Sequence, residues 1–207
     1  MHTSTLAVGS LGALRAAVTS ATLGAPPNAD VVVVPTAAAF TGAAEAALAL
    51  ARALEGLDAR VEALMVTDRA AADETYFVSR LTDADLVVLG DGSALHARSV
   101  WRHSRVGDAI NAATHLVAVG SVASVLGEVM IDPRGGAPTT GLNYRAGIAL
   151  CSPASLEQLG RTRSLLGGDV TLVVLGARGV LEWREGAWRV VCGDDVEVTR
   201  GARVVTL

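Results

Sequence analysis

Short runs of β-branched and aliphatic residues alternate along this chain with longer stretches rich in Ala and Leu. The runs with a strand-like composition are Val31–Val34, Arg60–Val66, Asp85–Leu89, Leu116–Val119 and Gly147–Cys151. The stretches with helical spacing of small and apolar residues are Thr41–Leu57, Ala70–Arg80, Ser99–Ala113 and Ala154–Leu166. Nearly continuous apolar runs are typical of strands that are buried on both faces. Their alternation with helices predicts an α/β fold, in which a parallel sheet is covered by helices on both sides.

The C-terminal part of the chain has a different pattern. From Val170 onward it consists mostly of short strand-like segments, and the turn at Arg184-Glu185-Gly186 is typical of a hairpin. This pattern predicts an antiparallel extension at one edge of the sheet. Trp183 and Trp188 flank the turn and can pair across it, and an exposed pair would indicate a dimer contact. We expect a single domain over residues 1–207.

Composition narrows the classes of function. The 207 residues are 51% hydrophobic, which is enough for a sizeable core. The net charge is −4, aromatic residues make up 3%, and no basic cluster is present, so nucleic acid and anionic membranes are not expected partners. The chain contains no Lys, which excludes a Schiff-base lysine and a P-loop lysine. We expect no cofactor.

The cysteines and the lengths of the apolar runs indicate the cellular compartment in which the protein is expected. Cys151 and Cys192 are too far apart for a CxxC site and give no disulfide framework, so buried free thiols in a reducing compartment are expected. No apolar run reaches the ~18 residues that span a bilayer. The N-terminus also lacks the pattern of a signal peptide. A cytoplasmic protein is therefore the expectation.

The most informative motif follows the run Leu116–Val119. The next residues are Gly120-Ser121-Val122-Ala123-Ser124. In a G-x-S-x-G nucleophile elbow, the third residue sits on a sharp strand-to-helix turn that carries its hydroxyl into the active site. Here the third residue is Val122, which has no atom that can attack a carbonyl. The motif indicates a hydrolase framework without its nucleophile.

Ligands of open α/β sheets bind at the carboxyl ends of the strands. Three segments are predicted there: Gly90–Ser93, Gly120–Ser124 and Cys151–Pro153. The residues expected to bind a ligand are Gly90, Asp91, Gly92, Ser93, Ser121, Val122, Asp132 and Arg134. The last two belong to the turn-rich loop Asp132–Pro138, where they either bind a charged ligand or fix the loop as an ion pair.

Four features taken together resemble peptidase family S51, which includes dipeptidase E and cyanophycinase. They are Pro35–Ala39 (PTAAA), the turn Gly90-Asp91-Gly92, the elbow Gly120–Ser124 and the hairpin-rich Leu175–Gly193. The resemblance extends from about Val31 to about Val198. The segments DPRGG and DGSALHARSV are more similar to an uncharacterised actinobacterial branch. This resemblance implies a class I glutamine-amidotransferase-like domain with a three-layer, flavodoxin-like parallel sheet.

The resemblance also implies a catalytic serine at the elbow apex, a histidine base later in the chain and an oxyanion site at the first Gly-rich turn. In this sequence the apex is Val122, and Asp91 replaces a glycine of the oxyanion turn. The base is expected just after Gly147–Cys151, where no His occurs. All four histidines (His2, His96, His103 and His115) precede the elbow. The expectation is a catalytically inactive protein that binds a small molecule, a peptide or a partner protein in the old cleft, or that forms a homodimer.

The alternative is a serine or cysteine hydrolase or acyltransferase with a rebuilt site. Its nucleophile would be Ser121, Ser124 or Cys151, and its base would be His96 or His103. Each of these residues also has a structural interpretation, because serines near a turn commonly bond its backbone or cap the next helix. The two histidines could bind a metal only with a third ligand such as Asp91 or Asp132, so no metal site is predicted.

Overall fold

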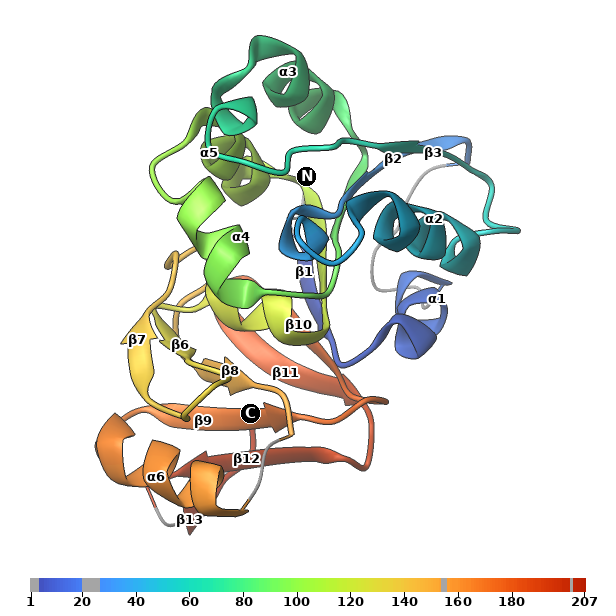
Figure 1. The fold of residues 1–207 in the computed structure, drawn as a ribbon. Helices are drawn as coiled ribbons and strands as arrows, with labels where there is room; N and C mark the ends of the chain where they lie inside the picture. The colour runs from blue at the N-terminus through green and yellow to red at the C-terminus, as the bar shows by residue number, and fades with distance from the viewer. Residues whose placement is uncertain (1–3, 20–26, 154–155, 202) are drawn as a thin grey trace.

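The computed structural model describes residues 4–19, 27–153, 156–201 and 203–207, and these residues form two β-sheets surrounded by helices (Figure 1). The first sheet has seven strands in the order β11-β10-β1-β5-β4-β2-β3, and the second has six in the order β13-β12-β9-β8-β6-β7. This is a mixed α/β fold with helices on both sides of a mostly parallel sheet, as the sequence predicts.

The first sheet contains five parallel strands and an antiparallel hairpin at one edge. The parallel strands are β1 (Ser4–Val8), β2 (Ala29–Val34), β3 (Ala59–Ala63), β4 (Leu86–Leu89) and β5 (His115–Val119). The hairpin strands are β10 (Val180–Arg184), which pairs with β1, and β11 (Ala187–Cys192). One face carries the helices α1 (Leu11–Thr19) and α2 (Ala43–Ala53), and the other carries α3 (Thr75–Asp83), α4 (Ala94–Trp101) and α5 (Arg105–Ala112) (Figure 1).

The continuous apolar runs are explained by burial on both faces. In β2, Val31 and Val33 belong to the hydrophobic cluster on the α1–α2 face, and Val32 and Val34 belong to the cluster on the opposite face. Because successive side chains of a strand point to opposite faces, a strand covered on both sides must be apolar at every position.

The second sheet lies below the first in Figure 1 and was not expected from the sequence. Its strands are β6 (Val129–Ile131), β7 (Pro138–Thr140), β8 (Ala149–Cys151), β9 (Thr171–Leu175), β12 (Val196–Arg200) and β13 (Arg203–Val204), and α6 (Leu156–Leu166) packs on it. β5 is already paired on both sides, by β1 and by β4, so later strands find no free edge beside it. β10 pairs with the free edge of β1, whereas β6, β7, β8, β9, β12 and β13 form the second sheet.

Two predicted helical stretches are interrupted, and the helix that the elbow motif implies takes another form. The stretch Ala70–Arg80 breaks at Glu74, between the 3₁₀ helix η2 (Ala71–Asp73) and α3. The stretch 99–113 is not one helix, because α4 ends at Trp101 and α5 starts at Arg105, with Ser104 accepting the Gly107 N–H as its N-cap. After β5 the chain forms a 3₁₀ helix, η3 (Gly120–Leu126), and then β6, where an α-helix was expected.

The predicted tryptophan pair is present. Trp183 and Trp188 are directly opposite each other on β10 and β11. Trp188 is buried and donates from Nε1 to the Ala146 carbonyl at 3.0 Å. Trp183 is partly buried and packs against the main hydrophobic cluster. The pair is therefore not a fully exposed patch and gives no support to a dimer contact, and the homodimer stays a prediction.

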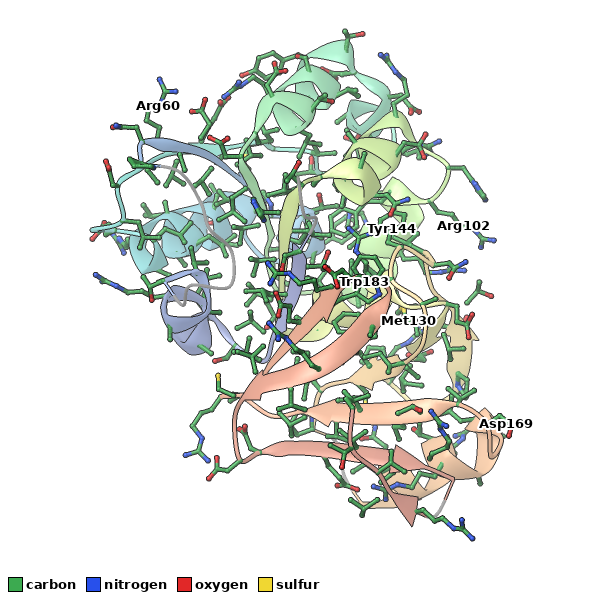
Figure 2. All side chains as sticks on the ribbon, turned by 180° about the vertical axis from the view of Figure 1, so that it is seen from behind. Arg60, Arg102, Met130, Tyr144, Asp169 and Trp183 are labelled. Carbon is green, nitrogen blue, oxygen red and sulfur yellow. The ribbon has the colours of Figure 1, made fainter. Side chains whose placement is uncertain are left out.

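The two sheets share one hydrophobic cluster, which contains Val34 and Leu89 from the first sheet and Val173 and Val198 from the second. Trp183 and Tyr144 lie near this junction (Figure 2). Arg145 is buried there: its Nε donates to Thr5 Oγ1 at 2.7 Å, and its guanidinium lies 4.8 Å from the centre of the Trp183 ring.

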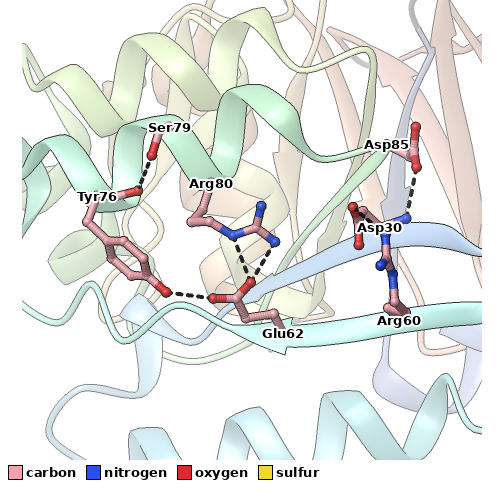
Figure 3. A network of polar contacts seen from close by, with 7 residues as sticks. All are labelled: Asp30, Arg60, Glu62, Tyr76, Ser79, Arg80 and Asp85. Carbon is pink, nitrogen blue, oxygen red and sulfur yellow. Dashed lines mark hydrogen bonds and ion pairs between the residues drawn. The ribbon is translucent and has the colours of Figure 1, made fainter.

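At the opposite edge of the first sheet, polar contacts fix β3 to α3 (Figure 3). Glu62 accepts hydrogen bonds from Arg80 at 2.6 and 2.8 Å and from Tyr76 Oη at 2.8 Å, and the Arg80 guanidinium lowers the pKa of Glu62. In the part of the chain described, every helix is too short or too polar to cross a membrane.

Candidate functional site

The candidate site lies at the carboxyl ends of β2 and β4, where the chain leaves the first sheet toward opposite faces. The chain leaves β2 toward α2 on one side of the sheet and leaves β4 toward α4 on the other, and ligands of α/β sheets bind at such a switch point. Here the PTAAA segment packs directly on the turn after β4, because the Ser93 N–H donates to the Ala37 carbonyl at 2.7 Å. A Cβ on Gly92 would lie 2.5 Å from that same carbonyl oxygen, so this turn requires glycine.

Asp91 joins the turn after β4 to the turn after β5. Its Oδ1 accepts the Gly92 N–H at 2.7 Å, the Ser121 N–H at 2.9 Å and the Ser121 hydroxyl at 2.8 Å. The Ser121 hydroxyl also lies 2.5 Å from the Gly92 carbonyl oxygen, so its single hydrogen is directed at these two acceptors. The Asp91 carboxylate thus accepts the backbone N–H groups of both turns.

Gly120 makes this contact possible. Its φ is +63°, and a Cβ there would lie 2.2 Å from Asp91 Cγ. Any other residue would displace the carboxylate and would also adopt a backbone conformation that L-residues disfavour. The first glycine of the elbow motif therefore leaves the space in which the Asp91 carboxylate contacts Ser121.

Val122, at the elbow apex, is fully buried in the main hydrophobic cluster. Ser124 is also buried, and its hydroxyl donates to the Ser121 carbonyl at 2.7 Å within η3. Ser121 and Ser124 therefore both have the structural roles that their sequence positions allow.

A cavity of about 120 Å³ lies beside these turns. It brings together two of the predicted segments, because its polar lining includes Ser121, Ser124, Asp132, Cys151, Ser152 and Thr162. Ala94, which follows the predicted segment Gly90–Ser93 and starts α4, also lines it. Gly90, Gly92 and Val122 are not among the lining residues.

Cys151 forms part of the cavity wall but is a poor nucleophile. Burial raises the pKa of its thiol to about 11, while Arg163 lowers it and Glu197 raises it by smaller amounts. The thiolate is the reactive form of cysteine, so this residue stays protonated and unreactive at neutral pH.

Asp132 and Arg134 form the ion pair that the loop composition suggests. The Arg134 guanidinium donates to both carboxylate oxygens, at 3.1 and 3.0 Å, and holds the pKa of Asp132 below its usual range. The Arg134 side chain is 77% exposed and that of Asp132 is 24% exposed. Asp132 therefore faces the cavity while Arg134 lies outside its lining.

Neither candidate base contacts a candidate nucleophile. His96 is two positions from Ala94, about 200° around the helix, and its Nε2 lies 2.8 Å from the Thr67 carbonyl oxygen. His103 is exposed, and its Nε2 accepts from Arg102 at 3.2 Å. No group of three or more His, Cys, Asp or Glu side chains within the described ranges could hold a metal ion.

Sequence reasoning missed the contribution of α6 to the cavity. Gln158 and Thr162 are one helical turn apart, and both line it with Gly136. Thr162 Oγ1 donates to the Gly136 carbonyl at 2.7 Å and lies 2.9 Å from the Gln158 carbonyl. Two polar residues four positions apart were the available signal, but only the tertiary structure shows that they face the elbow.

No protein-family model matches this chain, and no curated protein matches it significantly by sequence. Solved structures with the same fold include a peptidase from an acI-B1 actinobacterium, with a TM-score of 0.76 and 19% identity over 100% of this chain and 95% of that one. They also include a Listeria monocytogenes EGD-e protein named "Putative Peptidase E", with a TM-score of 0.67 and 13% identity over 97% and 99%. The chain therefore has a peptidase-like fold.

Proposed function

We propose that this protein is a catalytically inactive relative of the S51 peptidases, of the actinobacterial branch, and that it binds a small molecule or peptide at the old catalytic turns. The observation that carries the proposal is the position of Asp91, whose Oδ1 accepts three hydrogen bonds from Gly92 and Ser121. An oxyanion site stabilises negative charge through free donors. Here the donors are taken, and a second negative charge would be repelled.

The missing nucleophile and base support the same proposal. The apex side chain is a buried valine, and neither imidazole candidate contacts Ser121, Ser124 or Cys151. A serine hydroxyl without a base is a weak nucleophile at neutral pH. The cavity next to these turns is the feature that favours binding, because it retains both polar and apolar walls.

The test is covalent labelling with a fluorophosphonate together with hydrolysis of a dipeptide panel. We expect no labelled serine and no turnover above the buffer rate. Ser121→Ala and Ser124→Ala are the matched controls. Labelling that disappears in one of these variants, accompanied by turnover, would instead establish the hydrolase with a rebuilt site.

Val122→Ser gives a second test. The variant restores the hydroxyl at the apex but not the base, and members of a catalytic triad act as a unit. We expect it to remain inactive. Dipeptide turnover by this variant would show that the remaining parts of the site are catalytically competent. It would contradict the argument that Asp91 and the missing base also prevent catalysis, and would leave Val122 as the one cause of inactivity in the natural chain.

A further inference from the structure

Three residues that line the cavity, Ser121, Ser124 and Thr162, have hydroxyls that donate to oxygens of the protein. Ser124 Oγ donates to the Ser121 carbonyl, and Thr162 Oγ1 donates to the Gly136 or Gln158 carbonyl. The Ser121 hydroxyl donates to Asp91 or to the Gly92 carbonyl. Carbonyl and carboxylate oxygens only accept, so the one hydrogen of each hydroxyl is already used in a hydrogen bond within the protein. The lone pairs of each hydroxyl oxygen can still accept. These three residues therefore offer acceptors to whatever enters the cavity.

The charges around the cavity favour the same kind of ligand. None of the described lining residues is cationic. Asp132 contributes a carboxylate, which is paired with Arg134 outside the lining. Asp91, which bonds Ser121, adds a second carboxylate behind the wall. A carboxylate near a bound group favours positive charge and disfavours negative charge.

The start of α4 is the feature that would favour an anion, because a helix N-terminus carries partial positive charge. Two donors at this point are already satisfied: Ser93 Oγ accepts the His96 N–H at 3.3 Å, and Asp91 accepts the Gly92 N–H. The protein thus supplies its own anion next to this helix.

The remaining walls set the size and the apolar part of the ligand. Ile131, Leu159 and Pro133 line the cavity together with the protonated thiol of Cys151. An apolar cavity of about 150 Å³ accepts benzene. A volume of about 120 Å³ therefore suits a short aliphatic stem with one polar end.

From the acceptor-lined wall, the two carboxylates and the small volume, we infer that this cavity binds a protonated primary amine on a short aliphatic stem. The inference rests on the proposed function, since it treats the catalytic turns as a binding site. A free small amine and the end of a lysine side chain share this chemistry.

Three probes of similar shape separate the alternatives: n-propylamine, n-propanol and propionate at pH 7 and equal ionic strength. Titrations followed by NMR of the protein should give millimolar affinity for propylamine, at least tenfold tighter than for propionate, with propanol between them. Nα-acetyl-lysine methylamide tests the peptide source: binding equal to that of propylamine assigns a lysine side chain, and markedly weaker binding assigns a free amine. Tighter binding of propionate, or equal binding of all three probes, would overturn the inference.

Two variants locate the binding. Ser152→Leu adds bulk to the wall at a half-buried position and should reduce propylamine affinity at least tenfold. Ser79→Leu makes the same change on the exposed surface of α3 and should have no effect. Unchanged affinity in Ser152→Leu would place the amine elsewhere and contradict the inference. A preference for propionate would overturn the inference and leave the assignment as an inactive protein standing. Fluorophosphonate labelling with turnover would overturn that assignment, whichever probe the cavity prefers.

Discussion

The Asp91 carboxylate accepts the backbone N–H of Ser121 at 2.9 Å, across the two turns that follow adjacent strands β4 and β5. The same oxygen accepts the Gly92 N–H, and Gly120 leaves the space that the carboxylate fills. This single side chain thus joins the two turns through the backbone N–H groups of Gly92 and Ser121. This arrangement and other buried polar groups should affect the free energy of unfolding, its pH dependence and the reactivity of the thiols.

The contact between Asp91 and Gly120 should appear as a coupling free energy. Asp91→Ala should cost about 1 kcal/mol, because its hydrogen bonds are partly exposed to solvent. Gly120→Ala should cost more than about 2 kcal/mol in the natural chain, because the new Cβ meets the carboxylate and φ is positive. In the Asp91→Ala background that cost should fall to about 1 kcal/mol.

Urea unfolding of the four proteins in this cycle measures the coupling. Asp91→Asn is the control, since it keeps an oxygen acceptor and removes only the charge. Strictly additive losses would show that the carboxylate does not occupy the space beside Gly120.

The two cysteines should differ in reactivity. Because burial raises the pKa of Cys151 to about 11, roughly one thiol in three thousand is ionised at pH 7.5. Cys192 is exposed. Iodoacetamide should therefore modify Cys192 first, which mass spectrometry of the digested protein would show.

In Cys192→Ser, modification of Cys151 should be slow and should accelerate about tenfold for each pH unit up to pH 10. Rapid alkylation of Cys151 at neutral pH would mean that its thiolate is stabilised, and the site would then regain a candidate nucleophile.

His115 should make stability depend on pH between about 5 and 7. Burial lowers its pKa below 6.5, Arg184 lowers it further, and Asp85 opposes both. Since the unfolded chain binds the proton more readily, the contribution of His115 is complete above pH 6.5 and is lost as the pH falls. The lowered pKa values of Glu62 and Asp132 act at more acidic pH, below about 4.5.

The free energy of unfolding should therefore decrease from pH 7 to pH 5, and His115→Gln should flatten this slope. His103→Asn is the control, because His103 is exposed and Asn tolerates its φ of +55°. An unchanged slope in His115→Gln would assign the pH dependence to other groups.

Two arginine–glutamate pairs should differ in their contribution to stability. Glu182 is fully buried and accepts from Arg189 Nε at 2.5 Å, whereas the Glu62 side chain that pairs with Arg80 is 36% exposed. Arg189→Ala leaves a buried carboxylate with fewer partners and should cost about 2 kcal/mol. Arg80→Ala should cost less than about 1 kcal/mol, as is usual for exposed pairs.

Thermal unfolding resolves this difference, since 1 kcal/mol corresponds to about 2–4 °C in a chain of this size. Glu182→Gln combined with Arg189→Ala should recover part of the loss, because the buried charge is removed. Equal losses for the two arginine variants would show that Glu182 is well solvated or fully compensated by its other partners.

The sequence by itself determined most of the local elements and the residues of the elbow motif. Runs such as Val31–Val34 predict doubly buried strands because every position must be apolar, and the Trp183–Trp188 pair follows from the spacing around one turn. The valine at the third position of the elbow motif, Val122, and the lack of a His after Cys151 are visible in the sequence alone.

Only the tertiary structure decided which strands pair and which side chains meet. β1 and β4 occupy both edges of β5, so β6, β8 and β9 pair in a second sheet, and α6 on that sheet brings Thr162 to the cavity. The contact between Asp91 and Ser121 likewise joins residues thirty positions apart. Local patterns depend on neighbours in the chain, whereas these pairings depend on competition among distant segments for the same edges and surfaces.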